Sequence, residues 1–238
     1  MMTTRPAPAR ASSPASGNAF VYILIACVLL GALTYSLSRS YNTGGAAKDL
    51  DDTRALIAAD SILAYAGNAA NVITQLDQTG VSDDEIVFTI PSDAAFNNAP
   101  TTEKLFHPDG GGLNYKPLPK DAIDQDLTGN PVAGYYIGRF NNTEWTPSTT
   151  NDIIFTAWGI RREVCAALNK KLLGSATIPT ELNLPQMRRT MVDAIYHSGA
   201  NADATAAGCP SCDGKPSLCM RTGGVPYVYA FYSILVAR

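Results

Sequence analysis

The chain carries little charge and almost no histidine. Lysine, arginine, aspartate and glutamate make up 16% of its 238 residues, against about 25% in ordinary soluble proteins. The formal net charge is -3. This nearly neutral, slightly acidic balance excludes a nucleic-acid-binding protein that works by neutralising phosphates. The hydrophobic fraction of 46% is ordinary, which excludes a chain that is disordered throughout.

The sequence also lacks the common catalytic motifs. It contains no G-x-S-x-G, no H-E-x-x-H and no G-x-x-x-x-G-K, the patterns of serine hydrolases, zinc proteases and nucleotide-binding loops. Its two histidines, His107 and His197, lie far apart and outside any motif, so both are expected on the surface or in loops. We therefore predict that the protein is not an enzyme and uses no cofactor, no metal and no small-molecule substrate.

One long apolar run lies near the N-terminus. Residues 19–37 read AFVYILIACVLLGALTYSL and contain no charged side chain. As a helix this run is about 28 Å long, close to the thickness of the hydrocarbon core of a bilayer. Tyrosines lie toward both of its ends, where aromatic rings favour the membrane interface. We predict a transmembrane helix over residues 19–38. Its transmembrane positions include Ala19, Phe20, Tyr22 and Leu37.

A cleaved secretory signal and a buried core helix are the alternatives to a membrane span. A signal has a shorter apolar core of about 7–15 residues and a small-x-small cleavage site, and residues 37–40, LSRS, match that site poorly. A buried helix is disfavoured because the run directly follows a leader rich in proline, alanine and serine. The membrane span is therefore the favoured interpretation.

The basic residues around this run predict its orientation. Arg5 and Arg10 both precede the span, whereas Arg39 is the only arginine close behind it. Positive charge is enriched on the cytoplasmic side of membrane proteins. We therefore expect residues 1–18 to be a cytoplasmic leader and the chain to cross the inner cell membrane once. The C-terminal part would lie in the periplasm or outside the cell.

The residues that follow the span carry a helical apolar pattern. Spacings of mostly three and four are typical of one face of a helix. The residues of this pattern are Leu56, Ile57, Leu63, Ala66, Ala70, Ile73 and Leu76. The segment 42–45, NTGG, is the only break before the pattern, and Gly80 ends it. We predict a long helix in two halves, with an amphipathic spine over residues 39–80. Two unrelated helices joined by a loop are the alternative.

Residues 81–238 are expected to form an external globular domain. Clusters of β-branched and aromatic residues predict strands at residues 85–90, 134–140 and 225–236. Helical spacing predicts helices at residues 153–173, with Gly174 as the C-cap, and at residues 184–197. A long N-terminal helix followed by a few strands and one or two helices predicts an α+β fold with a small antiparallel sheet.

Together these features resemble a bacterial type IV pilin-like protein, meaning a minor pilin or a pseudopilin. Gly17 ends the polar leader and is followed by Asn18 and the apolar run, which resembles the junction at which a prepilin is cleaved. The amphipathic half up to Gln78 resembles the second half of the pilin spine helix. The resemblance implies a structural subunit of a type IV pilus or a type II secretion pseudopilus. It implies the membrane, other pilin or pseudopilin subunits and a prepilin peptidase as partners.

The sequence departs from this family at two points. Pilins usually carry glutamate at the fifth residue after the cleaved glycine, and this position, counted from Asn18, is Tyr22. Residues 12–16, SSPAS, replace the basic residues that usually precede the glycine. In the family the glutamate neutralises the N-terminal amine of a neighbouring subunit, because a buried amine without a partner is costly. A subunit at the filament tip has no neighbour above it, so we expect a minor, tip-proximal subunit.

A different class of function is the alternative. The chain would then be a single-span membrane protein whose outer domain binds a ligand or assists assembly without entering a filament. Gly17 would be a loop glycine in an uncleaved anchor. An unrecognised membrane-anchored enzyme is a third and weaker interpretation.

Four of the five cysteines follow the span: Cys165, Cys209, Cys212 and Cys219. An even number in an oxidising compartment favours two disulfides, and four cysteines allow three pairings. We expect one disulfide from the helix of Cys165 to the loop of residues 208–224, and one within that loop. Cys27, inside the span, is expected to be an inert apolar residue.

Two chemical interpretations of the cysteines are weaker. Cys209 and Cys212 have the C-x-x-C spacing of redox proteins, but this pair lies in a loop instead of opening a helix after a strand. The same two residues with Cys219 and His197 could bind zinc, yet a second paired set of ligands is missing. Both interpretations rank below the disulfides.

An acidic loop is the remaining candidate for a cation site. It contains Asp121, Asp124 and Asp126. Carboxylates are the ligands that Ca²⁺ prefers, but this spacing does not fit an EF-hand. A solvated acidic loop without a metal is therefore expected.

Overall fold

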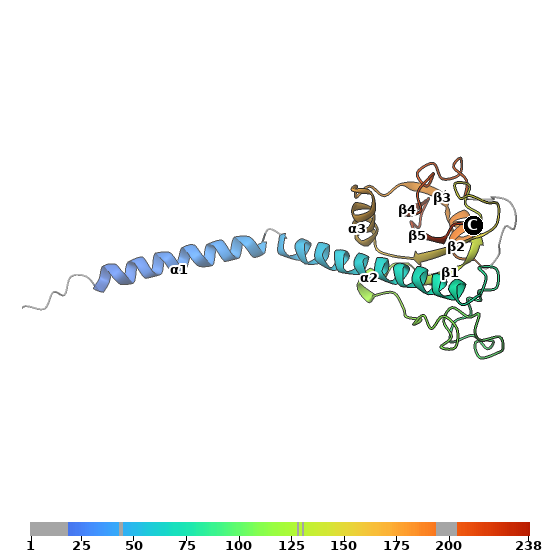
Figure 1. Ribbon diagram of the computed structural model, residues 1–238. Helices are drawn as coiled ribbons and strands as arrows, with labels where there is room; N and C mark the ends of the chain where they lie inside the picture. The colour runs from blue at the N-terminus through green and yellow to red at the C-terminus, as the bar shows by residue number, and fades with distance from the viewer. Residues whose placement is uncertain (1–18, 43–44, 128, 130, 194–203) are drawn as a thin grey trace, which may run out of the picture. The chain divides into compact units, whose positions relative to one another are not determined.

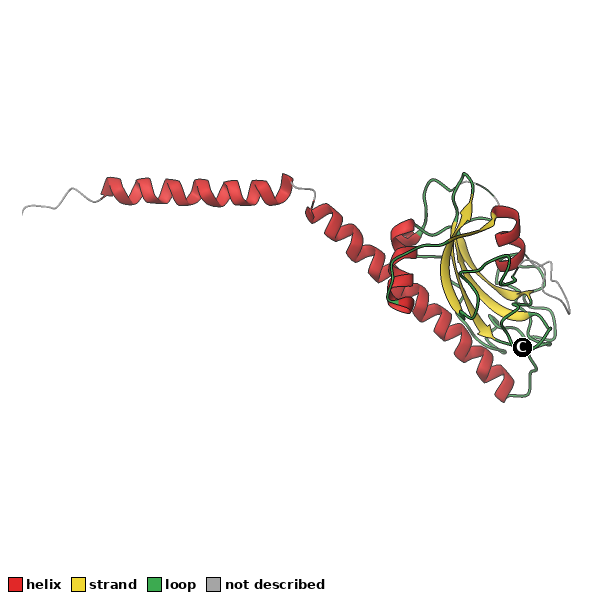
Figure 2. Cartoon of the chain, turned by 90° about the horizontal axis from the view of Figure 1, so that it is seen from above, coloured by secondary structure: helices red, strands yellow, loops and turns green. Residues whose placement is uncertain are grey.

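The computed structural model describes residues 19–42, 45–127, 129, 131–193 and 204–238. The chain forms two compact units, Met1–Leu50 and Asp51–Arg238. The described residues form an α+β structure with four α-helices, a short 3-10 helix and a five-stranded sheet (Figures 1 and 2). The sheet and the two shorter helices all belong to the second unit.

Two long helices come first in the chain. α1 covers Ala19–Asn42 and α2 covers Gly45–Gln78 (Figure 1). α2 is rich in alanine, which has the highest intrinsic helix propensity. Soon after its end Gly80 adopts a φ of 94°, a left-handed conformation that glycine reaches without strain. Residues 43 and 44, part of the predicted break, lie outside the described residues.

The sheet is mixed, which corrects the prediction of an antiparallel sheet. Its strands are β1 (Gly134–Asn141), β2 (Asp152–Trp158), β3 (Thr180–Asn183), β4 (Ser217–Gly223) and β5 (Tyr229–Val236), in the order β1-β2-β5-β4-β3. All neighbours are antiparallel except β3 and β4. The chain leaves β3 through helix α4 (Leu184–Met191) before it returns as β4. A parallel pair needs a long crossover of this kind.

The predicted helix over residues 153–173 is wrong in its first half, which forms strand β2. All seven residues of β2 are buried. A strand buried on both faces lacks the apolar–polar alternation that marks a half-buried strand, so it is easily confused with a buried helix. Gly159, with a φ of 70°, follows the strand. Helix α3 then covers Arg162–Leu173, and Gly174 provides the left-handed C-cap.

Other predicted elements differ from the structure at their bounds or are absent. Residues 85–90 form no strand, and Val87 makes only an isolated bridge with Lys104. The predicted strand 225–236 begins at Tyr229, because Pro226 cannot donate a ladder hydrogen bond. The predicted helix 184–197 ends at Met191 as α4, and residues 194–197 lie outside the described part.

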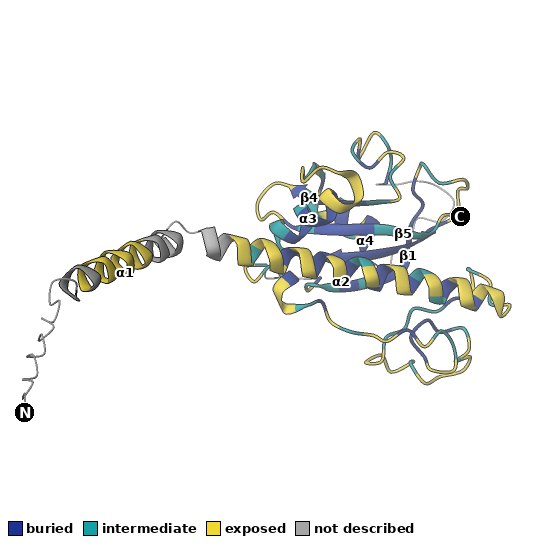
Figure 3. Cartoon of the chain, turned by 60° about the vertical axis from the view of Figure 1, so that its left-hand side comes forward, coloured by how far each residue is buried: buried dark blue, intermediate teal, exposed yellow. Residues whose placement is uncertain are grey.

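Both faces of the sheet are covered by other elements (Figure 2). On one face the ring of Tyr65 in α2 lies 4.6 Å from the ring of Tyr135 in β1 and 6.0 Å from that of Phe155 in β2. Figure 3 shows that the buried residues of α2 lie on its sheet-facing side. On the other face, Met187 of α4 and Cys212 belong to a second apolar cluster. Each face of the sheet therefore has its own core.

The long connection between α2 and β1 is held by a buried lysine. Lys104 is only 4% exposed. Its ammonium donates hydrogen bonds to the carbonyl oxygens of Ala95 and Phe96, at 2.6 and 2.8 Å, and to that of Asn98. An ammonium has three N–H donors, and here each has a carbonyl acceptor. A buried charge that is fully hydrogen-bonded in this way fixes the path of an otherwise irregular segment.

The same connection contains glycines that no larger residue can replace without rearrangement. A Cβ built on Gly111 would lie 2.6 Å from the carbonyl oxygen of Leu105 and 2.6 Å from a methyl group of Val72 in α2. Gly67 of α2, in contrast, is exposed and has no atom within 4 Å of its added Cβ. Gly67 is therefore a suitable control for a substitution of Gly111 by alanine.

We expect Gly111→Ala to destabilise the protein by ~1–3 kcal/mol, because overpacking against backbone cannot relax easily. Gly67→Ala is expected to stabilise it by ~0.5–1 kcal/mol, because alanine loses less backbone entropy in a helix. Thermal unfolding of the full-length protein in detergent, followed by circular dichroism, measures both changes. Equal Tm values for the two variants would contradict this account of the connection.

Candidate functional site

Residues 23–35 of α1 present an apolar surface on all sides of the helix. Every residue of this stretch is exposed. Its large apolar side chains are Ile23, Leu24, Ile25, Val28, Leu29, Leu30, Leu33 and Tyr35. The hydroxyl of Thr34 donates to the carbonyl oxygen of Leu30 at 2.8 Å, so this polar group is satisfied inside the helix. A helix that is apolar all round is typical of a lipid environment or of a helix bundle.

The predicted residues at the N-terminus can be placed only in part. Ala19, Phe20, Tyr22 and Leu37 lie within α1, but their side chains lie outside the described part of the structure. Gly17 and Asn18, the predicted cleavage site, also lie outside the described residues. Cys27 is exposed on α1 and has a free thiol.

By length and composition alone, one helix of the described part could cross a membrane: residues 49–78 of α2. The described stretch of α1, residues 23–35, is apolar but shorter. The two helices differ in where their apolar side chains lie. Those of α2 are largely buried against the sheet and the connection that follows, whereas those of α1 are exposed. Burial inside a globular unit accounts for the apolar composition of α2.

The buried face of α2 agrees with the predicted stripe only in part, because Ala66, Ile73 and Leu76 are buried as predicted. Leu56 and Ile57 were expected on the buried stripe, but they are 42% and 64% exposed. The buried face also contains residues that the predicted stripe left out: Ala55, Ala58, Ala59, Ile62, Tyr65 and Ala69. Alanine lets the helix approach the sheet closely, and the low apolar contrast of an alanine-rich sequence explains why the pattern was misread.

Ion pairs join the N-terminal half of α2 to α3 and to Arg161, the residue that precedes α3. Arg161 donates to both carboxylate oxygens of Asp51, at 2.9 and 2.8 Å, and Lys171 lies 2.8 Å from Asp60. Hydrogen bonding to Asp51 raises the pKa of the Arg161 guanidinium. Such partly exposed pairs contribute ~0–1 kcal/mol each.

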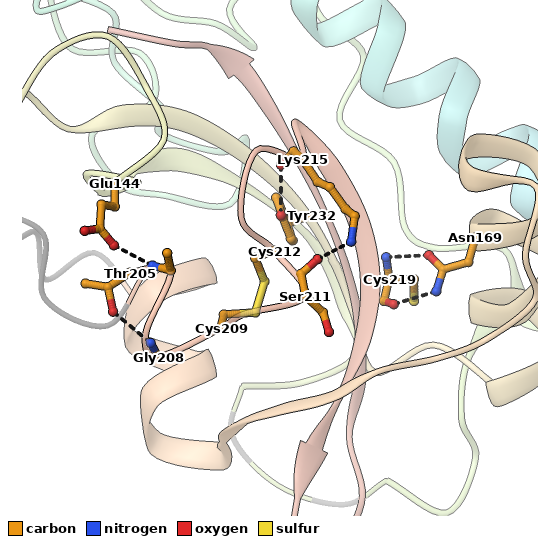
Figure 4. The surroundings of a disulfide bond; sticks show 11 residues. Glu144, Asn169, Thr205, Gly208, Cys209, Ser211, Cys212, Lys215, Cys219 and Tyr232 are labelled. Carbon is orange, nitrogen blue, oxygen red and sulfur yellow. Dashed lines mark hydrogen bonds between the residues drawn. A yellow bond between two sulfur atoms is a disulfide. The ribbon is translucent and has the colours of Figure 1, made fainter.

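The four cysteines after α1 form two disulfides on opposite faces of the sheet. Cys165 of α3 is bonded to Cys219 of β4, and Cys209 is bonded to Cys212. The first belongs to the core beneath α2 and α3, and the second to the core beneath α4. Cys219 lies in a strand and not in the expected loop. Figure 4 shows the surroundings of Cys209 and Cys212.

An asparagine reinforces the disulfide between α3 and β4. The side-chain amide of Asn169 donates to the carbonyl oxygen of Cys219 at 2.8 Å, and its oxygen accepts from the Cys219 N–H at 2.8 Å (Figure 4). The amide also donates to the carbonyl oxygen of Thr177 at 2.8 Å. Asn169 thus pairs with the edge of β4 as a strand would, and it holds the segment that leads to β3.

The C-x-x-C pair does not have the setting of a redox site. Cys209 and Cys212 are 1% and 0% exposed, whereas reactive thiols are partly exposed and lie in electropositive surroundings. Hydrogen bonds hold the adjacent turn: Tyr232 donates to the carbonyl oxygen of Lys215 at 3.0 Å, and Lys215 donates to that of Ser211 (Figure 4). The disulfide and these hydrogen bonds hold the short irregular segment of residues 209–215 against the second core.

No metal site is evident in the part of the chain that the structure describes. That part has no group of three or more histidine, cysteine, aspartate or glutamate side chains that could hold a metal. In the acidic loop, Asp124 accepts from the backbone N–H of Asp126 at 3.1 Å. His107 accepts from the N–H of Asp109 at 3.2 Å, and His197 lies outside the described residues.

No protein-family model, no curated protein and no solved structure matches the chain.

Sequence reasoning missed Asn169 and Lys104, two buried residues whose polar side chains bond to backbone groups of the second unit. Asn169 lies on α3 with lysines directly after it, a pattern that gives no indication of burial. Lys104 lies in a segment rich in proline and glycine, where the sequence gives no indication that a lysine is buried. No local signal could have found either, because their acceptors come from the folded backbone.

We expect Asn169→Ala to lower stability by ~1–3 kcal/mol, because the N–H and carbonyl of Cys219 would stay buried without these partners. Lys170→Ala, at the next and exposed position, is the matched control and should change stability by less than about 0.5 kcal/mol. Urea unfolding of both variants with intact disulfides measures the difference. Equal stability of the two variants would show that Asn169 does not hold β4.

Proposed function

We propose that this protein is a membrane-anchored structural subunit of the type IV pilin-like class. The observation that carries the proposal is the uncharged surface of residues 23–35 of α1, which exposes large apolar side chains on all sides. Such a helix needs lipid before assembly and neighbouring helices afterwards. The α+β unit that includes most of α2 would be the external domain.

The orientation and the disulfides support an extracytoplasmic external domain. Arg5 and Arg10 precede α1, which favours a cytoplasmic leader. Two disulfides in the second unit fit an oxidising compartment. In this proposal a prepilin peptidase cleaves between Gly17 and Asn18, and other pilin or pseudopilin subunits pack against α1. Neither nucleic acid nor a small-molecule substrate has a role.

A second candidate function is a single-span protein whose external domain binds a partner without entering a filament. One observation favours it, a groove beside β1 that is lined by Phe106, Tyr136 and Val192. Binding through such a groove does not require removal of the leader. The fate of Gly17 therefore separates the two candidates.

We expect the mature protein to begin at Asn18, with a methylated amino group. Mass spectrometry and N-terminal sequencing of protein purified from membranes of cells that contain a prepilin peptidase measure this directly. Gly17→Val should leave the leader attached, because a branched side chain blocks a site shaped for glycine, whereas Ser16→Val is the matched control. An intact Met1 or Met2 in the unaltered protein would overturn the pilin-like proposal.

We expect Tyr22→Glu to increase the share of the protein in the body of the filament. A carboxylate at this position would pair with the N-terminal amine of a neighbouring subunit, which otherwise stays buried without a partner. Tyr35→Glu is the control, since it adds the same charge at the other end of the run. Quantitative immunoblotting of sheared filaments measures incorporation. Equal incorporation of Tyr22→Glu and the unaltered protein would refute the tip-proximal position.

A further inference from the structure

Residues 205–215, called the cover segment below, lie over the second core without forming a helix or a strand. Two of them, Cys209 and Cys212, are buried, at 1% and 0% exposure. Every other residue of the segment is at least partly exposed. The disulfide is therefore the part of the cover segment that packs into the molecule.

The cover segment has few hydrogen bonds to its surroundings. Among the described residues, its backbone-to-backbone hydrogen bonds stay within the segment, as from the N–H of Cys212 to the carbonyl oxygen of Cys209 at 2.9 Å. Two side chains from elsewhere hold it (Figure 4). The hydroxyl of Tyr232 donates to the carbonyl oxygen of Lys215 at 3.0 Å, and the carboxylate of Glu144 accepts from a backbone N–H of the segment. A segment held in this way opens locally at a low free energy.

The other disulfide joins two regular elements. Cys165 belongs to α3 and Cys219 to β4, and both are 0% exposed. Asn169 binds the N–H and the carbonyl oxygen of Cys219, each at 2.8 Å, and Cys219 also pairs with Phe231 in the ladder between β4 and β5. A reagent reaches this bond only when α3 separates from β4, which opens the core beneath α2 and α3.

The two disulfides are buried alike, so their order of reduction depends on which surroundings open first. In an opened segment, a thiolate of a dithiol reductant attacks one sulfur of the disulfide, and the second thiol of the reductant resolves the mixed disulfide. The S–S bond of the protein breaks, and its two sulfurs gain two electrons and two protons. The reductant leaves as a disulfide. Opening of the cover segment needs less free energy than opening of the core beneath α2 and α3.

We propose that the disulfide between Cys209 and Cys212 is a redox-sensitive latch on the second core. A dithiol reductant cleaves it while the disulfide between Cys165 and Cys219 stays intact, and the cover segment then separates from the sheet. Because the pair is buried until the segment opens, it acts as a latch and not as a catalytic pair of thiols. The inference uses only residues of the second unit and does not rest on filament entry.

The core that the latch closes is rich in methionine. Met187 and Met191 of α4 and Met220 of β4 are each 0–1% exposed. Methionine is flexible and adapts to partners of different shape, and an exposed apolar surface of some extent marks an interaction site. Reduction of the latch therefore converts a sealed face of the unit into a surface that can bind apolar segments of other proteins.

Stepwise reduction of the full-length protein in detergent, without denaturant, tests the order of opening. Free thiols are blocked with N-ethylmaleimide, dithiothreitol is added, and new thiols are labelled with deuterated N-ethylmaleimide and assigned by peptide mass spectrometry. We expect label at Cys209 and Cys212 at least about tenfold faster than at Cys165 and Cys219. Equal rates, the reverse order, or no label at Cys209 and Cys212 would overturn the proposal.

Hydrogen exchange tests whether the bond controls the cover segment. In protein reduced only at Cys209 and Cys212, the backbone amides of residues 205–215 should exchange at least about tenfold faster than in the oxidised protein. The amides of α3 should exchange at unchanged rates, and reoxidation should restore the slow exchange of the segment. Unchanged exchange of residues 205–215 after reduction would show that the bond is no latch.

Two double variants separate the latch from the general loss of a disulfide. Cys209→Ala combined with Cys212→Ala should speed exchange of the cover segment and oxidation of Met220 by hydrogen peroxide, each at least about fivefold. Cys165→Ala combined with Cys219→Ala is the matched control and should leave exchange of the cover segment unchanged. Equal acceleration in both would indicate general destabilisation and overturn the proposal. If a variant does not fold, hydrogen exchange of the reduced, unaltered protein decides.

Discussion

The second unit depends on the burial of both faces of one sheet. Every residue of β2 is buried, so the sheet needs a cover on each side. α2 and α3 supply one cover, which is large and helical. The other consists of the eight-residue α4 and an irregular segment, which have little hydrophobic surface of their own. The disulfide between Cys209 and Cys212 lies in this weaker cover, where a covalent constraint compensates for limited apolar burial.

Parts of this architecture could be predicted from the sequence because their signals are local. The strand near residues 134–140 is rich in aromatic and β-branched residues and begins at a glycine, and the C-cap at Gly174 is a local motif. β2 could not be distinguished from a helix, because its burial on both faces removes the alternation on which strand prediction relies. β3 was missed because a four-residue strand is defined only by its pairing with β4. The stripe of α2 was predicted correctly at Ala66, Ile73 and Leu76 but wrongly at Leu56 and Ile57, which are large and apolar yet exposed.

Some of the candidate sites could likewise be predicted from the sequence, whereas others could not. The apolar surface of α1 could be predicted because it depends on composition alone, and the cysteines could be predicted as disulfide partners because they are even in number. Asn169 and the groove along β1 could not be predicted. Both depend on which backbone edges of the sheet stay unpaired, and this follows from strand order. The two edges are treated differently: a side-chain amide pairs with β4 beside β3, whereas β1 ends the sheet with an apolar groove beside it.

The buried ammonium of Lys104 gives the irregular connection a chemical signature. Its three hydrogen bonds to Ala95, Phe96 and Asn98 leave no face of the amine open to a reagent. An amine-acylating label can reach it only when these carbonyls separate, while the exposed Lys170 reacts at all times. The ratio of label at Lys104 to label at Lys170 therefore reports how often the connection opens. This measurement does not require the whole protein to unfold.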